Sequence, residues 1–238
     1  KGYVELLREA ELLTDGSSKI ADEPNNLSVA PTPFILDVSE PKKLRIYSRR
    51  NFCSESRLAA GIHGMCSASA SEVNEVKEAL GQLEQTLKNA REKGDKKAYS
   101  LNPLQLKAAE LAVSEKFSVI CGGPGTGKTT TVKAILNLYE GIYDRVALCA
   151  PTGRAAKRLS ELTGRKASTI HRLLEVDYTG GVVSFIHNDK NLLKCDVVIL
   201  DEMSMVDVKL FQALIAALRY SCRIIMAVSY THLRAHET

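Results

Sequence analysis

The second half of the chain contains short, nearly unbroken hydrophobic runs, and these runs predict strands. They cover Phe117–Cys121, Val146–Ala150, Asp196–Leu200 and Arg223–Met226. Between them, apolar residues recur at three- and four-residue steps, which predicts helices over Lys128–Tyr139, Gly153–Leu162 and Val206–Leu218. Short apolar strands that alternate with helices indicate a parallel sheet covered on both faces, and therefore the α/β class.

The first hundred residues show a different, mixed pattern. An amphipathic helix is predicted over Tyr3–Leu13, and the runs Phe34–Val38 and Leu44–Ser48 predict a hairpin. A longer helix near Val73–Leu87 has an apolar residue at every third or fourth position. Glycine turns at Gly180–Gly181 predict a second, small hairpin inside the α/β region.

Length and composition indicate one or two soluble domains. The chain has 238 residues, 45% of them hydrophobic. We expect a small, mostly helical N-terminal domain over residues 1–100 and the α/β domain over residues 101–227. No apolar run is long enough to cross a bilayer and no signal-peptide pattern opens the chain, so we expect a cytoplasmic location without a membrane partner.

The charge and the cysteine content say little about the function of the protein. The net charge of +4 is compatible with nucleic-acid binding but does not establish it. The six cysteines form no C-x-x-C pair, and we interpret them as buried free thiols of a cytosolic protein.

The stretch "GGPGTGKTTT" is the first motif that specifies chemistry. It fits the pattern G-x-x-x-x-G-K-[ST], with a predicted strand before it and a predicted helix after it. Glycines let the backbone curl so that its N–H groups point at phosphate oxygens, and the helix N-terminus adds a positive dipole end. The predicted nucleotide-binding residues are Gly122, Gly123, Pro124, Gly125, Thr126, Gly127, Lys128, Thr129 and Thr130. Of these, Lys128 is expected at the β- and γ-phosphates, and the Thr129 hydroxyl on Mg²⁺.

The second motif, "DVVILDEMSMVD", places an acidic pair after a buried strand. Ligands of open α/β sheets bind at the carboxyl ends of the strands, where Asp201 and Glu202 are expected. We assign Asp201 to Mg²⁺ and Glu202 to the water that attacks the γ-phosphate. Together with Lys128, this pair predicts a Mg²⁺-dependent nucleoside triphosphatase.

Three weaker stretches refine the prediction. Gln105 precedes Gly122 by seventeen residues and could pair with the adenine of ATP. In "APTGRAAKRL", a strand end opens onto Thr152, Arg154, Lys157 and Arg158, which could hold a nucleic-acid backbone. In "TIHRLL", His171 is a further candidate. For each stretch, an ordinary exposed helix surface remains the alternative.

Taken in order, these stretches resemble the superfamily 1 helicases, and the RecD family of exodeoxyribonuclease V alpha subunits in particular. The resemblance rests on "FSVICGGPGTGKTTTV", "APTGRAAKRL", "TIHRLL" and "VVILDEMSMVD", and more loosely on "TPFILD" with "LRIYSRRNFCSESRLAAGI". It implies a RecA-like P-loop domain. It also implies an ATP-driven 5′-to-3′ DNA helicase that works beside RecB and RecC subunits on broken duplex ends. By position, it assigns Thr152, Arg154 and His171 to single-stranded DNA.

Other functions remain open on the sequence alone. A stand-alone RecD relative, a Pif1-like helicase or the helicase part of a relaxase shares the same motifs. A third alternative is a protein of another class, namely an interaction module that changes conformation with ATP but is not a motor. The complete acidic pair at Asp201 and Glu202 argues against it, because such a module would not need to hydrolyse ATP.

The last residues do not continue the family pattern. The resemblance implies that "RIIM" runs into Gly-Asp-x-x-Gln-Leu and then a second motor domain with an arginine finger. Instead, Val228–Thr238 reads as the translation of a transposase-end sequencing adapter, with Ala227 at the join. We therefore expect residues 228–238 to be non-native, and the 238-residue chain to have negligible ATPase and no unwinding activity by itself.

Overall fold

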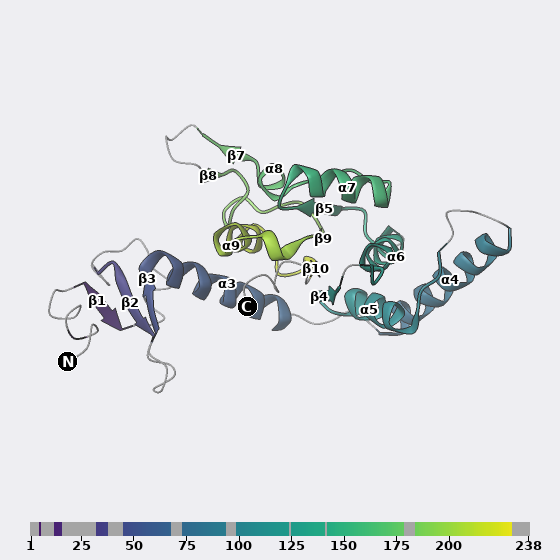
Figure 1. Ribbon diagram of the computed structural model, residues 1–238, viewed down its shortest axis with the longest axis horizontal. Coiled ribbons are helices and arrows are strands. Elements are labelled where there is room, and N and C mark those ends of the chain that lie inside the picture. The colour runs from purple at the N-terminus through teal and green to yellow at the C-terminus, as the bar shows by residue number, and fades with distance from the viewer. Residues whose placement is uncertain are drawn as a thin grey trace. The chain divides into compact units, whose positions relative to one another are not determined.

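The structure is a computed structural model (Figure 1). It describes Glu5 and residues 12–15, 32–37, 45–67, 73–93, 99–123, 125–140, 142–178 and 184–229. Contacts divide the chain into two compact units, which are treated separately here. The first unit comprises Lys1–Gly61 and Asp207–Ile215, and the second comprises Ile62–Val206 and Ala216–Thr238.

The first unit contains a three-stranded sheet and a long helix. Strand β1 (Leu13–Asp15) lies parallel to β2 (Phe34–Asp37), and β2 is antiparallel to β3 (Arg45–Ser48). The predicted hairpin is therefore confirmed. The predicted helix Tyr3–Leu13 is wrong at its end, because Leu13 begins a strand that pairs with Phe34. The rest of that helix, apart from Glu5, lies outside the described residues.

Helix α3 (Arg49–Ser67) follows β3 directly, and the buried Cys53 on it packs with Ile35 of β2. Helix α9 (Val208–Ala216) begins after Asp207, whose carboxylate accepts the N–H of Leu210 at 2.9 Å. The two helices approach closely at a glycine, since a Cβ on Gly61 would lie only 2.6 Å from Cγ2 of Ile215.

The second unit is built on the parallel sheet that the hydrophobic runs predict. Its order is β4-β10-β9-β5-β6, and every neighbouring pair is parallel. The strands are β4 (Phe117–Gly122), β10 (Arg223–Ser229), β9 (Val197–Leu200), β5 (Val146–Ala150) and β6 (Ala167–Thr169). Because they are parallel, their carboxyl ends meet at one edge of the sheet.

Both faces of the central strands are buried, as the unbroken hydrophobic runs predict. One face packs against helices through a cluster that includes Ala109, Ala112, Val113, Val132, Ile135, Leu136, Tyr139, Leu159, Val197, Ile199, Ile225 and Ala227. The helices are α5 (Pro103–Ser114), α6 (Lys128–Glu140) and α7 (Gly153–Thr163), and α4 (Val73–Glu92) adds Ala79, Leu80 and Leu83. Within the cluster, the Tyr139 hydroxyl donates to the carbonyl of Ala112.

Local signals explain where these helices begin and end. Asn102 and Gln105 form a capping box at the start of α5, and Pro103 occupies its first turn. Thr152 caps the start of α7, and Gly164 ends that helix in the left-handed conformation, with φ of 74°.

A short helix and a small hairpin complete the second unit. Helix α8 (Ile170–Leu174) follows β6, and strands β7 (Val176–Asp177) and β8 (Ser184–Phe185) pair antiparallel. This confirms the predicted hairpin, whose turn at Gly180–Gly181 lies outside the described residues.

The exposure of two cysteines and the length of β10 differ from the sequence predictions. Cys66 and Cys121 are exposed, so the prediction that all six cysteines are buried is wrong. Cys121 lies on β4, which is an edge strand of this sheet, where alternate side chains are less covered. Strand β10 extends to Ser229, three residues beyond the predicted end. Residues 230–238, most of the segment expected to be non-native, lie outside the described residues, and that expectation stays a prediction.

Candidate nucleotide-binding site

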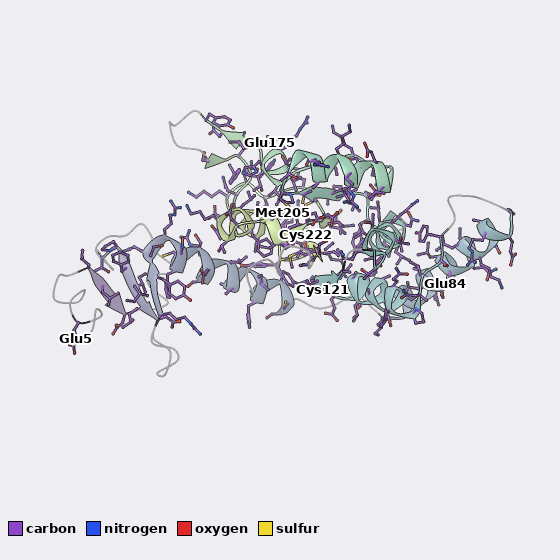
Figure 2. All side chains as sticks on the ribbon, in the orientation of Figure 1. Glu5, Glu84, Cys121, Glu175, Met205 and Cys222 are labelled. Atoms are coloured by element: carbon purple, nitrogen blue, oxygen red, sulfur yellow. The ribbon has the colours of Figure 1, made fainter. Side chains whose placement is uncertain are left out.

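The loop between β4 and α6 has the conformation that its glycines permit. Gly125 and Gly127 have φ of 76° and 80°, a region that other residues rarely adopt. A Cβ on Gly127 would lie 2.4 Å from Nε2 of Gln105, so a side chain there would require the end of the Gln105 side chain to move. Cys121, labelled in Figure 2, precedes the loop at the end of β4, whereas Pro124 lies outside the described residues.

The side chain of Lys128 folds over this loop. Its ammonium donates to the carbonyl oxygens of Gly122 at 2.6 Å and Gly123 at 2.7 Å. Thr126 closes the loop further, because its hydroxyl donates to the carbonyl of Gly123 at 2.9 Å. An ammonium has three donors, so Lys128 keeps one for another acceptor.

The acidic pair follows β9 at the same edge of the sheet. The N–H of Asp201 donates to the carbonyl of Cys149 on β5 at 3.0 Å, which fixes where the carboxylate leaves the sheet. Its Oδ1 accepts the N–H of Glu202 at 2.9 Å. Glu202 has φ of 55°, a strained value for a residue with a side chain, and such strain often occurs at functional positions.

The environment of Asp201 shifts its pKa in opposite directions. Burial raises the pKa of the Asp201 carboxyl, and the negative charge of Glu202 adds to that rise. The hydrogen bond from the Glu202 N–H and the positive charges of Arg158 and Lys128 lower it, but the net shift is upward. The carboxylate is therefore held in a place where a cation would stabilise it.

These groups line one cavity of about 400 Å³, a volume in the range of small-molecule sites. Its lining residues are Gly125, Gly127, Lys128, Thr129, Thr130, Arg158, Asp201, Glu202 and Ser229. The structure therefore brings the two predicted motifs together.

Two lining residues were not assigned to the nucleotide by sequence reasoning. Arg158 was grouped with the basic residues that could hold a nucleic-acid backbone, but it reaches this cavity from α7. Ser229, which belongs to the segment expected to be non-native, lines the cavity from β10, where it pairs with Gly122 at the mouth of the loop.

The residues present suit Mg²⁺. The Thr129 hydroxyl and the Asp201 carboxylate both line the cavity, and hard oxygen donors of this kind are the ligands that Mg²⁺ prefers. Over the described part of the chain, no group of three or more His, Cys, Asp or Glu side chains forms a metal cage. A two-ligand site is compatible with Mg²⁺, which usually keeps several waters and substrate phosphates as ligands.

Gln105 lies beside the loop rather than apart from it. Its Nε2 is 3.4 Å from the carbonyl oxygens of Thr126 and Gly127, and its Oε1 accepts the N–H of Asn102 at 2.9 Å. The side chain thus joins the start of α5 to the loop. Its pairing with adenine stays a prediction.

The residues assigned to DNA lie after two other strands of the sheet. The Thr152 hydroxyl accepts the N–H of Ala155 at 3.2 Å as the cap of α7, and Arg154 is exposed on that helix. His171 is exposed on α8, with its ring 6.0 Å from that of Phe185. Their contact with DNA stays a prediction.

Comparison with known proteins identifies the family. A model described as "AAA domain" matches residues 105–228, which begin at Gln105 and include every residue that lines the cavity except Ser229. The chain belongs to this AAA-domain family. Within it, the chain is a RecD-like member of helicase superfamily 1, as the relatives below indicate.

Of three curated relatives, two are named DNA helicases and one is named as a RecBCD enzyme subunit. The ATP-dependent RecD2 DNA helicase of Deinococcus radiodurans is 32% identical over 231 residues, covering 95% of this chain and 30% of the relative. The RecBCD enzyme subunit RecD of Haemophilus influenzae is 36% identical, covering 56% and 24%. The ATP-dependent DNA helicase dda of Enterobacteria phage T4 is 38% identical, covering 56% and 30%. The chain thus spans less than a third of the length of each.

Among the described residues, no helix is both long enough and apolar enough to span a membrane.

Proposed function

We propose that the cavity between the phosphate loop and the Asp201–Glu202 pair binds ATP together with Mg²⁺. The main support is that Lys128, Thr129 and the acidic pair line one cavity, although they come from separate parts of the chain. Loop N–H groups would hold phosphate oxygens, and Lys128 would place its charge at the β- and γ-phosphates. Thr129 and Asp201 would hold Mg²⁺, which when bound neutralises phosphate charge.

Glu202 is the residue proposed to act on water. It follows the metal-binding carboxylate directly and lines the same cavity. A carboxylate in this position can orient the attacking water and accept its proton. Arg158, which also lines the cavity, would add a positive charge beside the phosphates.

The protein that contains these residues is proposed to be an ATP-dependent DNA helicase that moves 5′ to 3′ along single-stranded DNA. The names of two relatives support an ATP-dependent DNA helicase, and the direction of movement rests on the resemblance to the RecD family. The topology also supports DNA binding. Thr152, Arg154 and His171 all follow carboxyl ends of parallel strands, as do the phosphate loop and the acidic pair. DNA held there would lie at the same edge of the sheet as the nucleotide.

The finer role is either that of an exodeoxyribonuclease V subunit or that of a stand-alone helicase. The subunit role, with RecB and RecC as partners in the repair and recombination of double-strand breaks, follows from the likeness to RecD. The stand-alone role is favoured by one observation. The match to RecD2 covers 95% of this chain, including most of its N-terminal hundred residues, whereas the match to the Haemophilus subunit covers 56%.

The helicase proposal is tested on the longer protein that contains these residues. Its ATP hydrolysis is expected to rise when single-stranded DNA is added, and DNA binding is expected to weaken as salt increases. Glu202→Gln should abolish the stimulated hydrolysis and leave ATP binding intact. Hydrolysis that does not respond to single-stranded DNA would remove the helicase proposal but not the nucleotide site.

The finer role is tested by purification. If the longer protein is a subunit, it should co-purify with RecB- and RecC-type chains from its own cells, and unwinding of blunt duplex ends should require them. If it acts alone, the purified protein should unwind a duplex with a 5′ single-stranded tail without any partner.

A further inference from the structure

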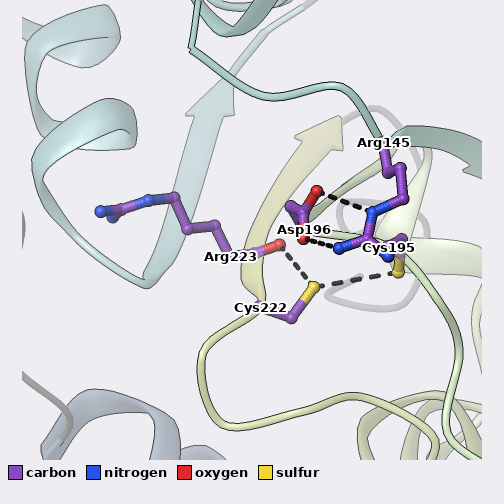
Figure 3. Close-up of polar contacts among 5 residues, drawn as sticks. All are labelled: Arg145, Cys195, Asp196, Cys222 and Arg223. Carbon is purple, nitrogen blue, oxygen red and sulfur yellow. Dashed lines mark hydrogen bonds and ion pairs between the residues drawn. The ribbon is translucent and has the colours of Figure 1, made fainter.

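Two buried cysteines face each other at the edge of the sheet opposite the nucleotide cavity. The Sγ atoms of Cys195 and Cys222 lie 3.9 Å apart, and the two residues are 7% and 0% exposed. Figure 3 shows the sulfurs directed toward each other. Cys195 precedes β9 and Cys222 precedes β10, so the pair lies at the amino ends of these parallel strands, away from Asp201.

The distance between the two sulfurs suits a disulfide. The S–S bond is about 2.0 Å long, and the sulfurs already lie 3.9 Å apart, so they would have to approach by about 2 Å. Both cysteines lie just before their strands, outside the paired residues of β9 and β10.

Backbone hydrogen bonds hold both segments in place. The N–H of Arg223 donates to the carbonyl of Asp196 at 2.9 Å, and the N–H of Leu193 donates to the carbonyl of Ala217 at 2.8 Å. Beside the cysteine pair, Arg145 donates two hydrogen bonds to the carboxylate of Asp196, the residue after Cys195. They measure 3.1 Å from Nε and 2.8 Å from Nη2 (Figure 3).

The surroundings favour Cys195 as the sulfur that reacts first. The hydrogen bond with Cys222 lowers the pKa of the Cys195 thiol, and the charges of Arg219 and Arg145 lower it further, against burial and Asp196. The same hydrogen bond and burial raise the pKa of Cys222. Since the thiolate is the nucleophile, Cys195 attacks and Cys222 follows.

We propose that Cys195 and Cys222 are a redox pair that a peroxide converts into an intramolecular disulfide. The Cys195 thiolate attacks one oxygen of hydrogen peroxide, the O–O bond breaks, and a sulfenic acid and hydroxide form. The Cys222 sulfur then attacks the sulfenic sulfur and expels its oxygen, which leaves as water with the Cys222 proton. In total, two thiols and one peroxide give one disulfide and two waters.

The disulfide would close a ring over residues 195–222, which contains β9 and the acidic pair. A cross-link of this size restricts the unfolded chain, so the oxidised protein is expected to unfold at a temperature about 5 °C higher. Addition of dithiothreitol should reverse the shift.

The test is peptide mapping of the folded 238-residue chain after brief treatment with hydrogen peroxide. Free thiols are then blocked with iodoacetamide in denaturant, and trypsin is added. Cleavage releases peptides 195–209 and 220–223, one with each cysteine. The expected product is these two peptides joined, two hydrogen atoms lighter than their sum and separated by dithiothreitol. Recovery of both peptides alkylated, or of either bonded to another cysteine, would overturn the proposal.

Two cysteine variants test whether this disulfide causes the rise in melting midpoint. Cys222→Ser should lose both the joined peptides and the shift in midpoint, whereas Cys66→Ser, at an exposed cysteine, should keep both. A shift that persists in Cys222→Ser would contradict the proposed cause. If Cys222→Ser does not fold, the peptide map of the unsubstituted chain still decides the question, because it requires no variant.

Discussion

The ammonium of Lys128 lies 2.6 Å from the carbonyl oxygen of Gly122, the last residue of the strand that leads into its loop. This contact closes the loop on itself and holds the cationic group at the cavity that also contains Asp201 and Glu202. The lysine thus serves two purposes: it organises the loop, and it presents a positive charge where phosphates are expected.

Removal of that charge should abolish about half or more of the nucleotide-dependent stabilisation. Mg²⁺-ATP at about a hundredfold excess over Kd stabilises a protein by about 2.7 kcal/mol, which raises the melting midpoint by several degrees. In Lys128→Ala we expect Kd to rise at least about tenfold, which lowers this stabilisation to about 1.4 kcal/mol or less and reduces the increase in melting midpoint in proportion. Lys133→Ala, on the same helix but paired with the ring of Tyr99, is the control and should keep the shift. An equal loss in both variants would contradict the role of Lys128.

Gly127 is the position where a single methyl group should disrupt the loop. Its φ of 80° disfavours any side chain, and a Cβ would displace the end of the Gln105 side chain, which contacts the loop. Gly127→Ala should therefore destabilise the fold by about 1–3 kcal/mol, measured by urea unfolding, and weaken ATP binding. Gly81→Ala is the matched control, because a Cβ at that helical position meets nothing within 4 Å. It should be neutral or stabilising by up to about 1 kcal/mol.

Asp201 should cost the protein stability at neutral pH. Its raised pKa means that the folded protein binds more protons than the unfolded chain between the ordinary value of 3.8 and the raised value. Stability therefore falls as pH rises through that window, and the cost is fully present above it. Asp201→Asn should unfold at higher urea than the unsubstituted protein at pH 7, and the difference should shrink as pH falls toward 4. The exposed Asp189→Asn should change stability by less than about 0.5 kcal/mol. A constant gain at all pH values would contradict the electrostatic cause.

Substitution of Arg158 distinguishes a role of this residue in nucleotide binding from a role in DNA binding. It lines the phosphate cavity, whereas the adjacent Lys157 lies on the exposed face of α7 beside Glu161. Arg158→Ala should weaken ATP binding about fivefold, equivalent to about 1 kcal/mol, and Lys157→Ala should leave it unchanged. The measurement is a titration with a fluorescent ATP analogue. Equal ATP affinity in the two variants would return Arg158 to the group proposed to face DNA.

Much of the second unit could be predicted from the sequence, because its signals are local. Unbroken apolar runs correctly predicted four strands, of which the central β9 and β10 are buried on both faces, and the glycine–lysine pattern correctly predicted a loop between a strand and a helix. The parallel order then placed the acidic pair at the same edge as the loop. The placement of the acidic pair beside the loop depends on the order of the strands in the sheet. The order of the motifs along the chain suggests that strand order but does not determine it.

Features that depend on the neighbours of a residue could not be predicted in this way. Cys121 lies in an apolar run, but its strand is at the edge of the sheet and the side chain is exposed. Leu13 fits a helical pattern, yet pairing with Phe34 makes it a strand residue. Arg158 belongs to a basic helix face, and only the three-dimensional structure shows that it reaches the nucleotide cavity.

The most direct test of the central claim is a calorimetric titration of ATP into the 238-residue chain, with and without Mg²⁺. We expect one site per chain, with affinity that falls when Mg²⁺ is removed and falls further in Lys128→Ala. In Asp201→Asn, the affinity should no longer depend on Mg²⁺. ATP binding with the same affinity in all three proteins, or no binding by the folded chain, would contradict the assignment of this cavity to the nucleotide.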